Sequence, residues 1–182
     1  LYSILYITSV IPVSTSVAIV KFISQAKTPK ERAAVYKSIS LFVLKLAAAI
    51  SLSVIIFSPF IAKFLNIDDF LEVAIVGPII FLGLVTLVNQ STLQGVLKFI
   101  GVVGPNFISS LGKLIFGLAF VFLGYSVMGA MWGVVIGVTG AYFYSLFLIK
   151  PVIDSKSSQK FKLGLFLKYS FPAFIQAIAF SS

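Results

Sequence analysis

The chain has 182 residues, of which 59% are hydrophobic and 10% are charged, and its mean hydropathy is +1.11. Soluble domains are about one quarter charged, so this composition excludes an ordinary water-soluble protein and indicates that lipid surrounds most of the chain. The sequence has no cysteine and no histidine, which excludes disulfides, Cys/His zinc sites and a Ser-His-Asp triad among these residues.

Apolar runs long enough to cross a bilayer follow one another along the chain. A spanning helix needs about 20 mostly apolar residues, and in hydrocarbon its backbone must satisfy its own hydrogen bonds. The candidate runs are Leu1–Val20, Ser38–Ala62, Val73–Leu93, Pro105–Leu123, Val127–Ile149 and a run that starts near Leu165. They predict an all-α, multi-span transmembrane bundle of about six spans.

The basic residues lie mainly between these runs. Lys and Arg number 14 against five acids, a net charge of +9 that in a soluble protein could indicate nucleic-acid binding. Here the first, third and fifth connections are basic and the second and fourth are not, which is the alternation that the positive-inside rule produces. We therefore interpret the charge as membrane topology, with the basic connections in the cytoplasm and no nucleic-acid partner.

In this topology the first predicted span crosses the membrane from the outside to the cytoplasm. We therefore expect one helix to precede it and the chain to be part of a longer multi-pass transporter of the cell membrane, built from two structural repeats. In this interpretation residues 1–149 form one lobe, residues 150–164 form a basic cytoplasmic connection, and residues 165–182 are the truncated start of a second lobe.

Two lysines fall inside predicted spans. Lys45 lies eight residues past Lys37 in the second predicted span, and Lys113 lies eight residues past Pro105 in the fourth, each about 12 Å along the helix axis. Either their stems snorkel to the headgroups, or the charges face the interior of the bundle. Asn106, Ser109 and Ser110 share a helical face with Lys113, and a polar face is costly in hydrocarbon, so this face is predicted to line a neighbouring helix or a wet cavity.

A second polar stripe lies on the third span. Thr86, Gln90 and Gln94 recur at helical spacing, with Asn89 beside them. Amides near the cytoplasmic end of a helix are also common in the headgroup zone. The stripe is therefore either an interfacial feature or one wall of a substrate path.

Small residues recur at every fourth position of the fifth span. Gly129, Gly133 and Gly137 form a doubled GxxxG pattern, which lets two helix backbones approach closely. This face is predicted to pack against a helix rather than to bind a ligand.

The five acids are all expected in loops. Without a carboxylate pair or a histidine in a span, the sequence predicts no metal site, no cofactor and no enzymatic activity. A membrane-embedded glycan-processing enzyme, the alternative from another class, would need clusters of Asp, Glu or His.

Three short motifs resemble one family of transporters. The runs Gln94–Lys98, Met128–Gly133 and Lys168–Pro172 are similar to helix starts and loops of the MATE-like polysaccharide flippases of the MOP superfamily, as helices two to six and part of seven. The resemblance implies a two-lobed protein that flips a lipid-linked oligosaccharide by alternating access. It also implies a cationic cavity for the pyrophosphate of a polyprenyl carrier, a role that Lys45 and Lys113 would fit.

A cation-coupled exporter of drugs or metabolites with the same fold is the alternative function. Its signature would be a carboxylate within a span. The partners expected in either case are membrane lipids and the second lobe of the same protein.

The topology is tested with single cysteines introduced into the cysteine-free sequence near Lys27 and near Lys156. Both positions are expected to react with a membrane-impermeant thiol reagent only from the cytoplasmic side, since both lie in basic connections. Labelling of the two positions from opposite sides would contradict the alternating arrangement.

Overall fold

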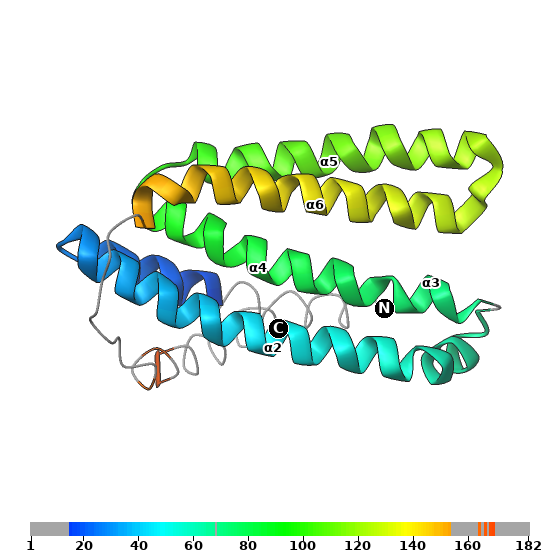
Figure 1. Cartoon of the computed structure of the whole chain (residues 1–182), viewed down its shortest axis with the longest axis horizontal. Coiled ribbons are helices and arrows are strands. Elements are labelled where there is room, and N and C mark those ends of the chain that lie inside the picture. The colour runs from blue at the N-terminus through cyan, green and yellow to red at the C-terminus, as the bar shows by residue number, and fades with distance from the viewer. Residues whose placement is uncertain (1–14, 68, 154–163, 165, 167, 170–182) are drawn as a thin grey trace, which may run out of the picture. The chain divides into compact units, whose positions relative to one another are not determined.

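The computed structural model describes residues 15–67, 69–153, 164, 166, 168 and 169. Within these residues the chain is helical, with short connections and no strand. Residues 15–25 are helical. The elements that follow are α2 (Pro29–Leu65), α3 (Phe70–Ala74), α4 (Val76–Gly95), α5 (Ile100–Phe120), a π-helical turn (Val121–Tyr125) and α6 (Ser126–Ile153) (Figure 1).

Four of the described helices are long and apolar enough to cross a membrane. They are Pro29–Leu65, Phe70–Gly95, Ile100–Tyr125 and Val127–Ile153. They correspond to the second to fifth predicted spans, so the all-helical membrane character is confirmed. Only residues 15–20 of the first predicted span are described, and the sixth lies almost wholly outside the described residues, as does most of the predicted inter-lobe connection.

Helix α2 begins nine residues before the predicted start at Ser38. The Oγ1 atom of Thr28 accepts a hydrogen bond from the backbone N–H of Glu31 (3.2 Å), and the Glu31 carboxylate accepts one from the backbone N–H of Lys27 (2.9 Å). This is a capping-box arrangement, and Pro29 occupies the first helical position, where its missing N–H costs nothing. A basic, water-facing turn therefore extends the membrane helix. The apolar run alone did not indicate this extension.

Two helices end on residues in the left-handed conformation. Asn66 after α2 has a φ of 53°, and Leu97 after α4 has a φ of 61°. In each case the next residue donates a backbone hydrogen bond across the turn, from Ile67 to the Ala62 carbonyl and from Lys98 to the Leu93 carbonyl, both 2.9 Å. These bonds satisfy carbonyl groups that a helix end leaves unpaired.

Helices α5 and α6 are joined almost without a loop. In the turn Val121–Tyr125 the chain is kinked at Gly124, whose φ of 91° is not helical. Glycine adopts this φ without the steric cost that a Cβ atom would impose. The uncharged connection predicted around Gly124 to Ser126 is therefore a tight helical reversal.

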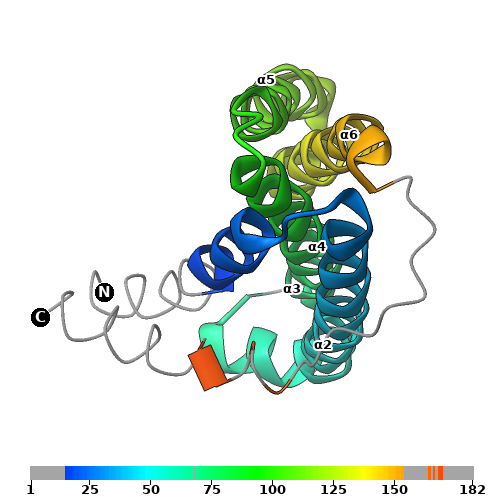
Figure 2. The same ribbon diagram turned by 90° about the vertical axis from the view of Figure 1, so that its left-hand side faces the viewer.

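The chain divides into two compact units. Among the described residues, unit 1 contains residues 15–41, Leu87–Val102 and those from Leu148 onward, and unit 2 contains Phe42–Thr86 and Val103–Phe147. Unit 1 thus combines the start of α2, the α4–α5 connection and the end of α6. Figure 2 shows these three segments toward the viewer. Helices α2, α4, α5 and α6 each contribute one end to each unit.

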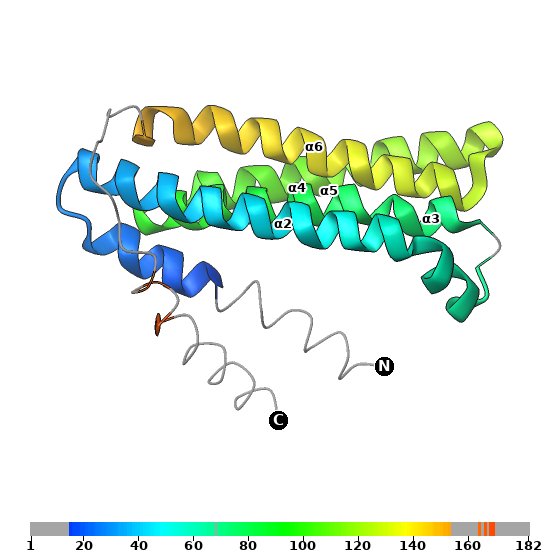
Figure 3. The same cartoon turned by 60° about the horizontal axis from the view of Figure 1, so that its bottom comes forward.

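Within unit 2, α2 lies along α4, as Figure 3 shows. At Gly77 of α4 a Cβ atom would come within 2.9 Å of the Ser51 carbonyl oxygen of α2. The absence of a side chain at Gly77 therefore lets these two helices approach closely.

The glycine ridge of α6 lies against α5 in unit 2. A Cβ atom added to Gly133 would overlap the backbone nitrogen of Gly117, and one added to Gly137 would lie 2.6 Å from the Ser109 carbonyl oxygen. Gly129 faces Phe120 and Tyr125 next to the helical reversal. Backbone therefore meets backbone along this contact, with no room for a methyl group at Gly133.

Replacing Gly133 with Ala is expected to lower the free energy of unfolding by about 1 to 3 kcal/mol, because the new methyl group overlaps the α5 backbone. Gly83→Ala is the matched control, since nothing lies within 4 Å of a Cβ at Gly83. The control is expected to stay within about 1 kcal/mol of wild type. Unfolding of the full-length protein by SDS in mixed micelles measures both, and equal stability of the two variants would contradict the packing.

Candidate functional site

Lys113 lies deeper in its helix than the sequence indicated. It follows Ile100, the first residue of α5, by thirteen residues, and it precedes Tyr125 by twelve in a membrane helix of 26 residues. Its Cα atom is therefore about 20 Å along the helix, near the middle, rather than about 12 Å. The hydrocarbon core of a bilayer extends about 15 Å to each side of the midplane, so a lysine at the centre of a helix that spans it lies too deep for its stem to reach the headgroups of either leaflet.

The stem of Lys113 passes beside α6. A Cβ atom on Gly137 would lie 3.2 Å from the Lys113 Cγ atom and 2.9 Å from the Lys113 backbone nitrogen. The glycine thus leaves space for the first part of the lysine stem. The side chain as a whole is exposed, and no described acidic group forms a salt bridge with it.

The residues of the polar stripe of α5 differ in their exposure. Asn106 and Ser110 are exposed like Lys113, whereas Ser109 is half-buried, with its carbonyl oxygen against Gly137. The exposed face of α5 therefore carries an amide, a hydroxyl and an ammonium group beside a row of large apolar side chains. Such a face is costly against lipid tails and needs water or a polar partner.

Lys45 is separate from this face. It lies on α2, belongs to unit 2 and is exposed, and no described contact joins it to Lys113. The structure thus places both predicted cavity lysines on exposed helix surfaces and does not bring their ammonium groups together.

The polar stripe of α4 is partly a packing feature. Thr86 is buried, and its Oγ1 atom has no hydrogen-bond partner among the described residues. Gln90 is half-buried and Gln94 is exposed near the end of the helix. Thr86, Gln90 and Gln94 therefore differ in their exposure.

Asn89 has a structural role that the sequence did not indicate. It is fully buried in unit 1, and its Oδ1 atom accepts a hydrogen bond of 2.8 Å from the hydroxyl group of Tyr36 on α2. Close by in the sequence, the Ser91 hydroxyl donates to Ser16 at 2.8 Å. Tyr36 falls in the stretch predicted to be a loop, so the helical extension of α2 was needed to place it opposite α4.

The expectation that all five acids lie in loops is wrong for two of them. Glu31 is in the first turn of α2, where it caps the helix. Glu72 is in α3, which runs into α4 as part of the membrane helix Phe70–Gly95. Asp69 caps α3 by accepting a hydrogen bond of 2.9 Å from the Leu71 N–H, and this cap extends the helix outward beyond the apolar run.

No metal site emerges among the described residues. They contain no group of three His, Cys, Asp or Glu side chains close enough to hold an ion. Together with the scattered acids, this leaves the exposed polar face of α5 as the candidate functional site, with Lys113 at its centre.

Comparison with known proteins gives no match. No protein-family model matches the chain, and no curated protein or solved structure is significantly similar to it. The resemblance to polysaccharide flippases therefore rests on the sequence motifs alone.

Replacing Asn89 with Leu is expected to destabilise the full-length protein by about 1 kcal/mol, because the Tyr36 hydroxyl loses a buried partner. Tyr36→Phe is expected to have a similar effect, and the double variant little more than either alone. Gln94→Leu, which changes an exposed amide, serves as the control. Additive effects of the two substitutions in SDS unfolding would show that the hydrogen bond does not stabilise the fold.

Proposed function

We propose that this chain forms part of one lobe of a transporter that flips lipid-linked oligosaccharides across the cell membrane. The position of Lys113, at the middle of a membrane helix and on an exposed face, is the observation that carries the proposal. The resemblance in the sequence motifs supplies the substrate class, and the four apolar helices supply the membrane setting.

A positive charge at mid-membrane needs a strong compensating interaction. On insertion scales a central lysine costs about 2.5 to 3.5 kcal/mol, and such residues commonly mark substrate or ion pathways. No described acid pairs with Lys113, so its counter-charge comes from elsewhere. A diphosphate offers this charge, because ammonium–phosphate hydrogen bonds are charge-assisted and strengthen where water is scarce.

The neighbours of Lys113 suit the same substrate. Asn106 and Ser110 are exposed on the same helix, about two turns and one turn before Lys113. Their amide and hydroxyl groups both donate and accept hydrogen bonds, as recognition of phosphate oxygens and sugar hydroxyls requires. Lysine binds phosphate as a point charge rather than through a bidentate fork, so this contact is adaptable and suits release as well as capture.

In the proposed mechanism two lobes rock about a substrate site near the midplane and open to each side in turn. The diphosphate would stay with Lys113 while the glycan crosses. The tight α5–α6 contact at Gly133 and Gly137 would let these helices move as one piece, because backbones packed this closely leave little freedom for sliding. Lys45, on α2, would supply a second cationic contact in one of the two states.

The alternative function, a cation-coupled exporter of drugs or metabolites, gains support from one observation. Glu72 is a carboxylate within a membrane helix. It stands third in that helix, however, and so lies at the helix end rather than at the midplane, where coupling ions bind in transporters of this kind. The central charge of this chain is positive, and this favours an anionic substrate.

Lys113→Met removes the charge but keeps a stem that fits beside Gly137. Glycan export by the full-length protein is expected to fall at least about tenfold, the effect of losing one hydrogen bond to a charged group. Lys113→Arg is expected to keep more activity than Lys113→Met because the charge remains.

Lys63→Ala is the control for this experiment, since Lys63 is exposed in the last turn of α2, away from the midplane. Export is measured with all variants present in the membrane at equal amounts. Wild-type export by Lys113→Met would remove Lys113 from the site, and export of organic cations in place of glycan would favour the alternative.

A further inference from the structure

A cavity of about 460 Å³ lies in unit 2, apart from the polar face of α5. Its described walls comprise eight aliphatic or thioether side chains and a single charged group, the carboxylate of Glu72. The volume is within the usual range for sites that hold small organic molecules. An apolar cavity with one carboxylate selects a ligand that has both an apolar body and a positive charge.

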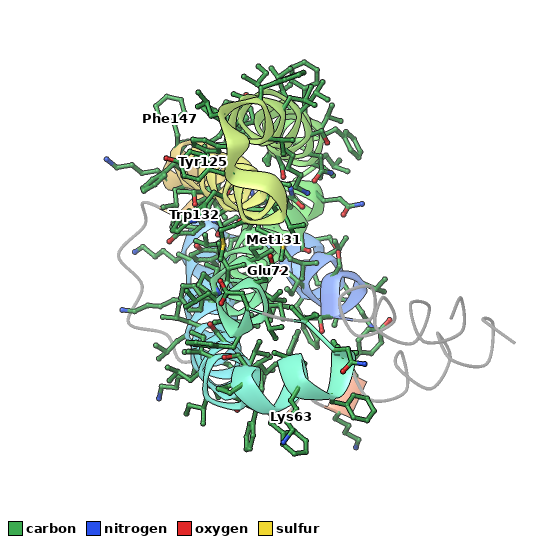
Figure 4. The ribbon with its side chains drawn as sticks, turned by 90° about the vertical axis from the view of Figure 1, so that its right-hand side faces the viewer. Lys63, Glu72, Tyr125, Met131, Trp132 and Phe147 are labelled. Atoms are coloured by element: carbon green, nitrogen blue, oxygen red, sulfur yellow. The ribbon has the colours of Figure 1, made fainter. Side chains whose placement is uncertain are left out.

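The Glu72 carboxylate forms no ion pair or hydrogen bond with the residues that the structure describes. No described basic side chain forms an ion pair with Glu72, and the nearest lysine along the chain, Lys63, lines a different cavity with Asn66 and Phe70. Figure 4 shows Glu72 near Met131 of α6, with Lys63 well away from both. The negative charge of Glu72 is therefore available to a ligand that occupies the cavity.

The cavity is polar near the helix ends and apolar farther in. Glu72 is the third residue of the membrane helix Phe70–Gly95, Leu65 is the last residue of α2, and Val127 is the second residue of α6. Val54 of α2 lines the cavity eleven residues before Leu65, about 16 Å farther along the helix. The charge thus lies at headgroup depth, and the apolar walls continue into the hydrocarbon region.

This arrangement matches an amphiphile rather than a compact cation. The ammonium group of a phospholipid would meet Glu72 at the headgroup level, and an acyl chain would extend along the deeper aliphatic walls. The lining also distinguishes between lipids. None of the described lining residues is aromatic, whereas quaternary ammonium groups are recognised by aromatic faces, so a primary ammonium that donates hydrogen bonds to the carboxylate fits better than choline.

We propose that this cavity is a binding site for an aminophospholipid of the phosphatidylethanolamine type, with Glu72 as the counter-ion of its primary ammonium group. By the positive-inside rule this site lies in the outer leaflet, since the second connection is not basic. The site is independent of the proposed transport function.

The test compares lipid binding by the full-length protein in detergent, measured by native mass spectrometry during titration with phosphatidylethanolamine or phosphatidylcholine of identical acyl chains. The wild type is expected to bind phosphatidylethanolamine at least about tenfold more tightly, as expected for one hydrogen bond to a charged group. Glu72→Gln is expected to abolish this preference.

Asp69→Asn is the matched control. It removes a negative charge three residues from Glu72, and asparagine still caps the start of α3. This variant is expected to keep the preference for phosphatidylethanolamine. Met131→Phe, which fills the cavity while keeping Glu72, is expected to weaken the binding of phosphatidylethanolamine.

Equal binding of the two lipids by the wild type would overturn the proposal, as would an undiminished preference in Glu72→Gln. Loss of the preference in Asp69→Asn to the same extent would also overturn it, because general surface charge would then explain the binding. Tighter binding of tetraphenylphosphonium than of phosphatidylethanolamine by the wild type would assign the cavity to organic cations instead.

Discussion

The need of every polar group for a partner in hydrocarbon determines this structure. Backbone N–H and C=O groups satisfy one another within helices, which is why the described chain is helical throughout its apolar runs. The ends of the helices solve the same problem in other ways, through the Thr28–Glu31 cap, the Asp69 cap and the left-handed residues Asn66 and Leu97. Because the backbone groups are hydrogen-bonded within the helices, it is the polar side chains and the close helix contacts that indicate function.

The polar side chains of the membrane helices fall into two groups under this constraint. Tyr36 and Asn89 satisfy each other inside unit 1 and stabilise the fold. Lys113 and Ser110 instead lie, with Asn106, on an exposed face of α5, where lipid tails would offer the Lys113 ammonium group no hydrogen-bond partner. An exposed polar group on a membrane helix indicates contact with water, substrate or further protein. Exposure therefore distinguishes the residues of the candidate site from the buried residues that stabilise the fold.

The helical fold could be predicted from the apolar runs because length and hydropathy suffice to identify a membrane helix. The helix boundaries could not, because the first turns of α2 and α3 are polar and are set by capping hydrogen bonds that hydropathy does not register. This error had consequences for the site. It left Tyr36 in a loop and assigned Glu72 to a connection. For Lys113 the cause is different: the predicted span began at Pro105, five residues after the first residue of α5, so Lys113 was placed too near the start of its helix.

The packing glycines were easier to place than the cavity residues. A spacing of four residues fixes one helical face whatever the boundaries are, so Gly133 and Gly137 could be assigned to a common face from the sequence. Thr86, Gln90 and Gln94 also share a spacing, yet the structure gives them different degrees of burial. Burial depends on which helices lie beside α4, and this is information that the sequence of α4 alone does not contain.

The division of charge between the two units has an energetic consequence for how the protein sits in an energised membrane. Among the described residues, unit 1 carries eight basic residues and one acid, whereas unit 2 carries three basic residues and two acids. Each charge carried across a potential of 100 mV changes the free energy by about 2.3 kcal/mol. In the topology predicted from the loop charges, inversion would carry the net +7 of unit 1 outward and the net +1 of unit 2 inward. This net transfer of six charges would cost about 14 kcal/mol at that potential, so the voltage of a living cell itself would hold the protein in one orientation.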